Sequence, residues 1–261
     1  MKLCVIGGAG ARSAFLTKSL VKSARDIRVD HIVLLDNDQQ KLKTYGEISR
    51  ELARRLDPEL TFEVTSDARA ALTGVDYIIT TIRAGGDAGR LFDEQTCLAH
   101  GVLGQETTGA GGFAMAIRSV PTLVYYCTLA REVANPGHLI FNFTNPSGII
   151  TQALRSRGFD NVYGICDAPS GFIKQLEEIL DIPYGTLDIE CYGLNHLSWF
   201  RNAKVNGRDV QRELLDNPRT YEHSEMRLFT REMARISGDC MLNEYLYFYY
   251  RRVKSLSMIQ K

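Results

Sequence analysis

Short apolar runs rich in β-branched residues alternate with longer amphipathic stretches from Lys2 to about residue 160, and this alternation limits the fold more than any other feature of the chain. The apolar runs span residues 3–7, 31–35, 60–64, 76–81, 138–143 and 161–165. Helical stretches lie near residues 12–24, 38–55, 114–134 and 146–157. Strands that alternate with helices predict a parallel sheet covered by helices. We therefore expect an α/β fold with a doubly wound, Rossmann-like parallel sheet.

The pattern changes after Pro169, where the sequence predicts a partial α+β domain. The expected elements are a helix near 170–180, strands at 187–192 and 198–205, and helices at 208–216, 222–236 and 241–258. We expect a Rossmann-like domain over residues 1–168 and a substrate domain over residues 169–261. No linker sequence separates them, so we expect them to pack as one body. The chain ends without a domain-closing signal, which predicts truncation at the C-terminus.

Charge and composition point to small-molecule partners. The 31 Lys and Arg residues balance the 31 Asp and Glu residues, so the net charge favours neither nucleic acid nor an anionic membrane. The first apolar run stops at glycines and is too short for a signal segment or a membrane span. The six cysteines contain no CxxC pair, as is typical of a reducing compartment. We expect a cytoplasmic protein.

A glycine-rich turn follows the first predicted strand and has the spacing of a dinucleotide-binding fingerprint. It reads Gly-x-Gly-x-x-Ser, and the residues expected to contact a pyrophosphate are Gly8, Gly10, Ala11, Arg12 and Ser13. Glycines allow close backbone approach, and the following helix N-terminus offers free N–H groups. Ser13 replaces the usual third Gly or Ala. The alternative is a glycine-rich turn without a ligand.

Asp36 ends the second predicted strand, where a carboxylate accepts hydrogen bonds from the adenosine ribose. A carboxylate there disfavours a 2′-phosphate, so we expect NAD rather than NADP. The alternative is that Asp36 caps the helix that begins near Asp38.

Polar residues after the fourth predicted strand indicate a substrate site. Arg83 lies at the carboxyl edge of the sheet, where doubly wound proteins bind ligands, and Arg90 follows on the next polar stretch. Guanidinium groups suit hydroxyl, carboxylate or phosphate groups. The alternative for both arginines is a surface ion pair. We expect Arg83 and Arg90 to bind substrate.

Two further loops carry candidate substrate ligands. The Gly-rich loop 103–112 presents Gln105 and Glu106, and such a loop is costly to order unless it contacts something. Its polar residues would otherwise only satisfy backbone groups in the turn. Asn145 follows the fifth strand and would bind a sugar hydroxyl or the nicotinamide, although Asn before Pro is also a common turn residue.

Cys166 follows the sixth predicted strand, and His196 follows a later one. One thiolate and one imidazole form an incomplete metal site, which leaves positions for substrate oxygens and water, as a catalytic metal requires. The alternative is a core position for both residues. Tyr245 belongs to an aromatic stripe at 242–250 that on spacing alone predicts helix packing.

Taken together, these motifs resemble the family 4 glycoside hydrolases, and most closely their 6-phospho-β-glucosidases. The motifs run in order along the chain as the glycine turn, Ile82–Gly85, Leu103–Thr107, Asn142–Pro146, Gly164–Cys166 and Gly193–His196. This family depends on NAD and stands apart from glycosidases that use two carboxylates. The resemblance also implies a homo-oligomer, a dimer or tetramer, that acts on a phosphorylated sugar.

The resemblance implies NAD and a divalent metal, usually Mn²⁺, as cofactors. NAD would take hydride from C3 of the sugar and return it later, so no net oxidation occurs. Cys166 and His196 would hold the metal at the C2 and C3 oxygens, and Tyr245 would remove the C2 proton. A tyrosine with a pKa of about 10 needs a nearby cation for this role.

Two departures from the family pattern leave alternatives open. Asp167 stands where many β-acting relatives have Asn, whereas α-acting relatives place there an acid that protonates the leaving group. A 6-phospho-α-glucosidase or α-uronidase is therefore an alternative. The chain is also shorter than family members, so a truncated, non-catalytic NAD-binding protein is another. Independently of these departures, a malate- or lactate-type dehydrogenase is a further alternative. Such an enzyme would share the nucleotide-binding motif but would need a histidine paired with an acid.

Overall fold

The computed structural model describes residues 1–259 and divides into two compact units. Unit one contains Met1–Asp93 and Gly112–Ile165, and unit two contains Glu94–Gly111 and the chain from Cys166 onward. The sequence-based division at residue 168 differs from this mainly in segment 94–111. That segment belongs to unit two because Gln105 and Thr107 approach Tyr245 there.

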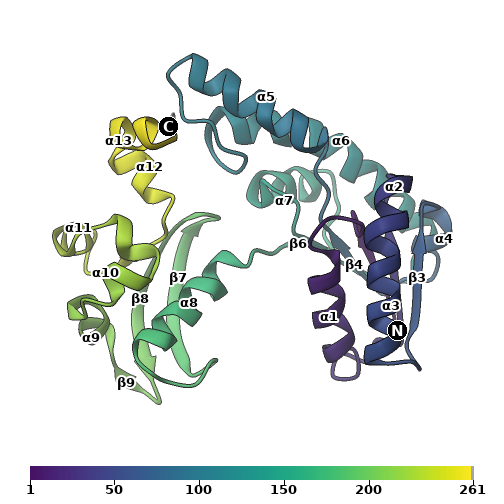
Figure 1. Cartoon of the computed structure of the whole chain (residues 1–261), viewed down its shortest axis with the longest axis horizontal. Coiled ribbons are helices and arrows are strands. Elements are labelled where there is room, and N and C mark those ends of the chain that lie inside the picture. The colour runs from purple at the N-terminus through teal and green to yellow at the C-terminus, as the bar shows by residue number, and fades with distance from the viewer. Residues whose placement is uncertain (260–261) are drawn as a thin grey trace. The chain divides into compact units, whose positions relative to one another are not determined.

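Unit one contains a six-stranded parallel sheet with the order β3-β2-β1-β4-β5-β6. Figure 1 labels β3, β4 and β6 of this sheet. Its strands are β1 (Lys2–Ile6), β2 (His31–Leu35), β3 (Thr61–Thr65), β4 (Tyr77–Thr80), β5 (Leu139–Asn142) and β6 (Val162–Gly164). This is the strand order of a Rossmann fold. The predicted fold class is confirmed.

Alternate side chains of the central strands enter two separate cores, one on each face of the sheet. Leu3 and Val5 pack under the helices of one face, whereas Cys4 and Ile6 pack under those of the other. The first face is covered by α1 (Ser13–Ser23) and α3 (Glu47–Leu56), and the second by α4 (Ala68–Leu72), α6 (Gly109–Val133) and α7 (Ser147–Arg155). The remaining helical elements are α2 (Gln39–Lys41), the π-helical turn η1 (Leu42–Gly46) and α5 (Gly86–Ala99). Helices on both faces make the sheet doubly wound.

The strand order reverses between β1 and β4, and the glycine turn lies at that point. Gly7 has a φ of +84°, and a Cβ there would lie 2.7 Å from the Thr81 carbonyl oxygen after β4. Only glycine lets the two strand ends approach so closely. In open α/β sheets this crevice at the carboxyl ends of the strands is the ligand-binding position.

Within residues 1–259, α6 is the one helix long and apolar enough to cross a membrane by length and composition alone. Its Leu123, Cys127 and Ala130 are buried in the core beneath the sheet. Core helices of globular domains meet the same criteria, and we assign α6 to that class.

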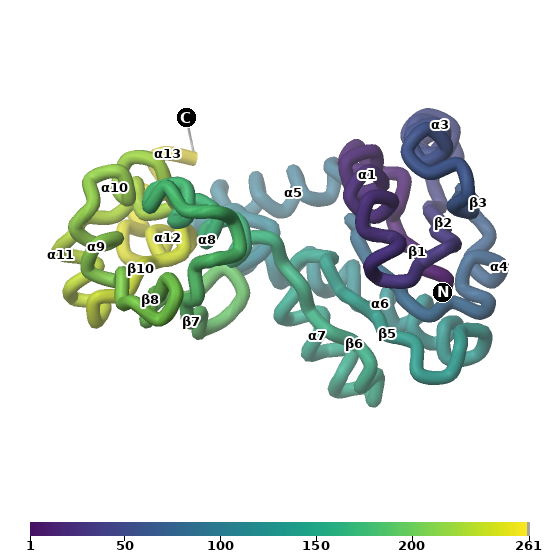
Figure 2. Tube along the Cα trace, turned by 90° about the horizontal axis from the view of Figure 1, so that it is seen from below, coloured from purple at the N-terminus to yellow at the C-terminus, as the bar shows by residue number. Residues whose placement is uncertain are grey.

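Unit two is built around an antiparallel sheet with the order β10-β8-β7, on which β9 pairs with β8 (Figure 2). The strands are β7 (Leu187–Leu194), β8 (Leu197–Val205), β9 (Arg208–Asp209) and β10 (Met241–Leu242). The helices are α8 (Ala168–Ile179), α9 (Gln211–Asp216), α10 (Thr220–His223), the 3-10 helix η2 (Glu225–Leu228), α11 (Arg231–Ile236), α12 (Leu246–Tyr250) and α13 (Arg252–Ile259). Phe172, Phe200 and Met226 are among its fully buried side chains.

Three helices predicted in unit two are interrupted. The predicted helix 222–236 breaks because Ser224 and Thr230 each accept a backbone N–H and begin a new helical segment. The predicted helix 208–216 begins with a short strand instead. The predicted helix 241–258 opens with β10, because Met241 and Leu242 pair with β8. A strand partner distant in sequence outweighs local helical propensity here.

Candidate active site

Cys166 and His196 lie together in unit two. Cys166 follows β6 and leads into α8, and His196 lies in the turn between β7 and β8. The Cys166 Sγ and His196 Nε2 atoms are 3.3 Å apart. Metal bonds of about 2.3 Å to sulfur and about 2.0 Å to nitrogen put two ligands of one ion roughly 3.0 to 3.5 Å apart, at angles from about 90° to tetrahedral. The separation therefore suits two ligands of one ion.

The backbone holds His196 in an unfavourable conformation. Leu194 pairs with Leu197, so Asn195 and His196 form a two-residue hairpin turn, and His196 has a φ of +58°. Gly193, just before the turn, has a φ of +119° and a space for Cβ only 2.4 Å from the Leu197 carbonyl oxygen. Glycine is the usual residue at a left-handed turn position. The turn thus directs the His196 imidazole toward Cys166 despite this backbone cost.

The two side chains favour each other's charged forms. Burial raises the pKa of Cys166, but hydrogen bonds from His196, the Ala168 N–H and Asn195 bring it below the usual value. Burial lowers the pKa of His196, but Cys166 and the carboxyl groups of Glu225 and Glu244 raise it overall. By contrast, burial raises the pKa of Cys4 to about 12, as is typical of a structural thiol. Cys166 is therefore easier to deprotonate than an ordinary thiol, and a thiol must be deprotonated to bind a metal.

Two buried polar atoms at this site have no hydrogen-bond partner. They are His196 Nδ1 and Asn195 Oδ1. Among residues 1–259 no group of three or more His, Cys, Asp and Glu side chains is placed to hold a metal. The site thus offers two strong ligands with Asn195 beside them, so substrate or water would complete the shell. The sequence did not predict a role for Asn195 in the site, although this residue precedes His196 in the same motif.

The Tyr245 ring stacks on the His196 imidazole, with ring centroids 4.4 Å apart and an angle of 21° between the planes. Burial raises the pKa of Tyr245, and the charges of Glu244 and Glu106 add to this effect. The polar side chains of Gln105 and Thr107 oppose it but do not reverse it. The phenol therefore needs a cation to ionise near neutral pH.

The other candidate residues of unit two serve in different ways. Gln105 Oε1 accepts the N–H groups of Thr107 and Thr108, each at 2.6 Å, so it supports its own turn while also facing Tyr245. Glu106 contributes negative charge near the phenol. Asp167 is exposed at the start of α8, with its Oδ1 atom 4.0 Å from Cys166 Sγ. An acid is thus adjacent to the candidate metal ligand.

In unit one, the glycine turn leaves room for a ligand. A Cβ added to Gly10 would meet no atom within 4 Å, whereas one on Gly8 would lie 2.9 Å from Leu34 Cβ. Ser13 is buried and its hydroxyl donates to the Gly10 carbonyl at 2.6 Å, while Ala11 and Arg12 are exposed at the start of α1. The open side of Gly10 suits a bulky anion at a helix N-terminus.

Asp36 is bound to the same turn. Its Oδ2 atom accepts the Ala9 N–H and its Oδ1 atom accepts the Asp38 N–H, both at 3.1 Å. Asp38, and not Asp36, caps α2 by accepting the Lys41 N–H. The alternative role of Asp36 as a helix cap is therefore wrong. A carboxylate has further acceptor capacity, which ribose hydroxyls would use.

The remaining candidate substrate residues lie in unit one. Arg83 follows β4 and forms an ion pair with Asp87, as the surface alternative proposed, and Arg90 lies on α5. Asn145 is half-buried and precedes Pro146 through a cis peptide bond.

Arg118, which the sequence did not reveal, binds the buried Asp93 with two nitrogens and donates to the Ala84 carbonyl. This pair fixes the loop that carries Arg83.

Glu225 is a buried acid of unit two that the sequence also did not reveal. Its Oε2 atom accepts the Asn243 Nδ2 group at 3.0 Å and the Glu244 N–H at 3.1 Å. Burial raises the pKa of Glu225 from 4.5 to about 7. The folded protein therefore holds this proton more tightly than the unfolded chain does. The resulting stability is present in full below about pH 4.5 and is lost as the pH rises through 7.

Glu225→Gln should remove this pH dependence, because an amide oxygen accepts the same two N–H groups without ionising. We expect the variant to gain on the parent by about 1 to 3 kcal/mol in unfolding free energy between pH 5 and pH 8. Urea denaturation at pH 5, 6.5 and 8 measures this difference. A constant difference across the range would contradict the raised pKa.

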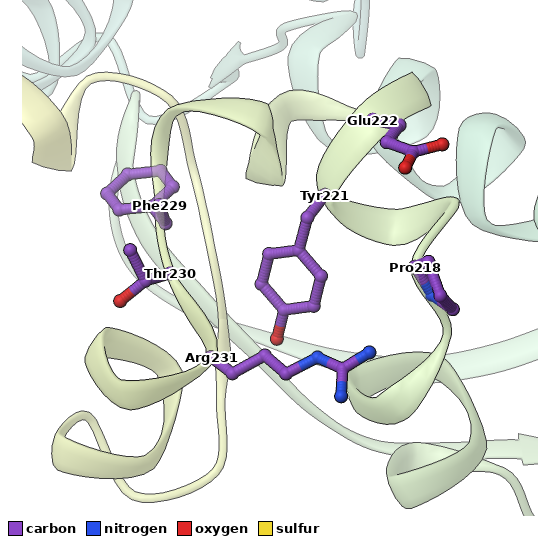
Figure 3. Close-up of a pocket in the computed structure, with 6 residues that line it drawn as sticks. All are labelled: Pro218, Tyr221, Glu222, Phe229, Thr230 and Arg231. Atoms are coloured by element: carbon purple, nitrogen blue, oxygen red, sulfur yellow. The ribbon is translucent and has the colours of Figure 1, made fainter.

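A separate cavity of about 400 Å³ lies elsewhere in unit two (Figure 3). It is lined by Pro218, Tyr221, Glu222, Phe229, Thr230 and Arg231. The Arg231 guanidinium lies 5.9 Å from the Tyr221 ring centroid. None of the predicted site residues lines this cavity, so it is distinct from the Cys166 and His196 site.

Comparison with known proteins identifies the family of this chain. The model of family 4 glycosyl hydrolases matches residues 2–182, and that of the family's C-terminal domain matches residues 191–261. The chain is 35% identical to the 6-phospho-beta-glucosidase BglT of Thermotoga maritima, over 83% of this chain and 51% of the relative. It is 33% identical to the phospho-alpha-glucosidase PagL of Clostridium acetobutylicum, over 83% of this chain and 50% of the relative.

A solved structure has the same fold. The Thermotoga maritima 6-phospho-beta glucosidase with manganese, NAD⁺ and glucose-6-phosphate superposes with a TM-score of 0.90 at 30% identity, covering 100% of this chain and 62% of that one. The chain spans about half the length of the curated relatives it matches. The family models, the identity to curated relatives and the shared fold lead to one conclusion: this chain belongs to the family 4 glycosyl hydrolases.

Proposed function

We propose that this chain hydrolyses 6-phosphoglucosides and uses NAD and a divalent metal as cofactors. Mn²⁺ is the metal that we expect. The observation that carries the proposal is the convergence of Cys166 Sγ and His196 Nε2 at 3.3 Å, with the Tyr245 ring stacked on the imidazole. A thiolate, an imidazole and a phenol in contact suit metal-assisted proton abstraction. Membership in the family supports this chemistry over that of a malate- or lactate-type dehydrogenase.

Residues of unit one would bind NAD, and residues of unit two would bind the metal. Gly8, Gly10, Ala11, Arg12 and Ser13 would bind the NAD pyrophosphate, and Asp36 would bind the ribose. Cys166 and His196 would hold the metal. When bound, NAD supplies reversible oxidation at C3 of the sugar, and the metal supplies Lewis-acid stabilisation of negative charge at the adjacent oxygens.

The chain's own side chains would move the protons and orient the sugar. Tyr245 would remove the C2 proton once its phenol is ionised, and the raised pKa of this tyrosine in the free protein makes a cation beside it necessary. Arg83, Arg90, Gln105, Glu106 and Asn145 would contact the phosphorylated sugar as a whole. Asp167 would act on the leaving group.

We propose a preference for β-linked substrates, which the identity to the Thermotoga maritima enzyme supports. One observation favours α-linked substrates instead. Asp167 places a carboxyl oxygen 4.0 Å from Cys166 Sγ, where an acid would protonate an α-linked leaving group. The two anomers therefore have to be compared directly.

The test is turnover of chromogenic 6-phospho-β- and 6-phospho-α-glucosides with NAD⁺, MnCl₂ and a thiol reductant. We expect release of the chromophore without accumulation of NADH, because the hydride returns to C3. Accumulation of NADH with a hydroxy acid would support a dehydrogenase. Binding of NAD without binding of Mn²⁺ and without turnover would support a non-catalytic module.

The glycine turn offers a matched pair of variants for the proposed NAD site. Gly10→Ala places a methyl group in open space, so we expect an unchanged unfolding temperature and at least about tenfold weaker NAD binding. Gly7→Ala forces a Cβ against the Thr81 carbonyl, so we expect a loss of about 1 to 3 kcal/mol in stability. Calorimetry measures both quantities. Unchanged NAD affinity in Gly10→Ala would contradict the proposed pyrophosphate site.

A further inference from the structure

Hydrogen-bonded polar side chains, buried at Glu225 and Asn243, form a path in unit two that ends at Tyr245. The path starts on α8, where Gln175 Oε1 accepts the Glu225 N–H at 3.0 Å. Glu225 Oε2 then accepts both the Asn243 side-chain amide and the Glu244 N–H. Glu225 is 9% exposed and Asn243 is 1% exposed, so water does not compete for these hydrogen bonds.

This path fixes the backbone that delivers Tyr245. The N–H of Asn243 donates to the Ser198 carbonyl at 3.0 Å, that of Glu244 to Glu225 at 3.1 Å, and that of Tyr245 to Asn243 Oδ1 at 3.2 Å. Three successive N–H groups therefore each have a different fixed acceptor. The chain enters α12 from this segment, and its direction there sets where the Tyr245 ring lies.

Glu225 is a buried acid that accepts two N–H groups, and ionising its carboxyl group there carries a desolvation penalty. The Arg227 guanidinium pairs with Glu244 at 3.7 Å, and among residues 1–259 no ion pair joins it to Glu225. An uncharged acceptor would satisfy the same groups without the desolvation penalty. The carboxyl group of Glu225 is electrostatically coupled to His196, whose ring stacks on Tyr245.

We propose that Glu225 and Asn243 form a positioning pair, which holds the Tyr245 ring against His196 through the fixed backbone of residues 243–245. The inference rests on the proposed function, in which Tyr245 removes the C2 proton. Glu225 and Asn243 touch neither substrate nor cofactor in this proposal. They act through the placement of Tyr245.

Asn243→Ala tests the pair, because it removes both the donor to Glu225 and the acceptor for the Tyr245 N–H. Displacement of a catalytic group by about 1 Å costs on the order of 100-fold in rate. We expect kcat to fall by about 10- to 100-fold while KM stays within about twofold. The isotope effect on kcat for a substrate deuterated at C2 should rise, because proton abstraction becomes slower than the other steps.

Glu177 provides a matched control, because it is a second buried glutamate of unit two. Its Oε1 atom accepts the N–H groups of Thr186 and Leu187, at 2.9 and 3.0 Å, at the start of β7. Glu225→Leu and Glu177→Leu each leave two N–H groups without an acceptor, so both should lower the unfolding temperature. Only Glu225→Leu should lower kcat, and Glu225→Gln should recover most of the loss. Equal kcat in the two leucine variants would overturn the proposal.

Amide hydrogen exchange gives a readout that does not depend on activity. In the parent chain we expect protection of the N–H groups of residues 243–245, and we expect Asn243→Ala to exchange there at least about tenfold faster. Glu177→Leu should leave this segment unchanged. If the parent turns over no phosphoglucoside, the proposed function fails, yet exchange still decides whether the pair fixes this segment. Equal exchange in parent and Asn243→Ala would overturn the pair.

Discussion

Tyr245→Phe should lower kcat by about 100- to 10,000-fold, because the substitution removes the hydroxyl group that we propose accepts the C2 proton and leaves the ring in place. The Tyr245 ring stacks on His196 and lies 5.1 Å from the Phe248 ring, and phenylalanine keeps both contacts. Affinities for NAD and Mn²⁺ should therefore not change. Steady-state kinetics and calorimetric titrations with each cofactor measure these quantities.

Tyr249→Phe is the matched control, since Tyr249 lies on α12, the helix that Tyr245 precedes, with 53% of its surface exposed. We expect this variant to have the parent's kcat. If Tyr245→Phe instead loses NAD binding while Tyr249→Phe does not, Tyr245 is part of the cofactor site and its role as base is refuted.

His196→Asn should weaken Mn²⁺ binding by on the order of 100-fold or more, because one of the two proposed metal ligands is lost. Asparagine tolerates the left-handed backbone that His196 adopts, as Asn202 and Asn206 do in the same unit with φ values of +56° and +51°. The turn and the unfolding temperature should therefore persist. Electron paramagnetic resonance of free Mn²⁺ measures the affinity directly.

His223→Asn is the control for a general loss of imidazole, because His223 is exposed on α10, where its Nε2 atom lies 3.7 Å from Glu222. This variant should bind Mn²⁺ as the parent does. Parent-like Mn²⁺ affinity in His196→Asn would contradict the metal site, and with it the proposed glycosidase chemistry.

Much of unit one follows from its sequence. The apolar run 31–35 coincides with β2, and the other five runs coincide with strands to within one or two residues. The signal is clearest for the central strands β1 and β2, because a strand buried on both faces must be apolar. Unit two is less regular. The predicted helix from 241 fails at Met241 and Leu242, since their pairing with β8 depends on residues some forty positions away.

The candidate site shows the same division. Cys166, His196 and Tyr245 were identified through motifs and resemblance, and the structure brings all three into contact. Glu225 and Asn243 carry no sequence signal, because a buried glutamate cannot be distinguished from a surface one when its acceptors and donors lie on other elements. Asn195 was overlooked beside His196, although the sequence motif contained it.

The amino-acid sequence alone established the alternation of strands and helices, the glycine turn after β1, and the family, because each of these depends on local periodicity or on short motifs. Tertiary structure decided that a thiol and an imidazole thirty residues apart meet at 3.3 Å, and that a tyrosine ring covers the imidazole. Such contacts arise from the hairpin between β7 and β8 and from the pairing of β10 with β8. Their distances are set by non-local packing, which no local sequence pattern encodes.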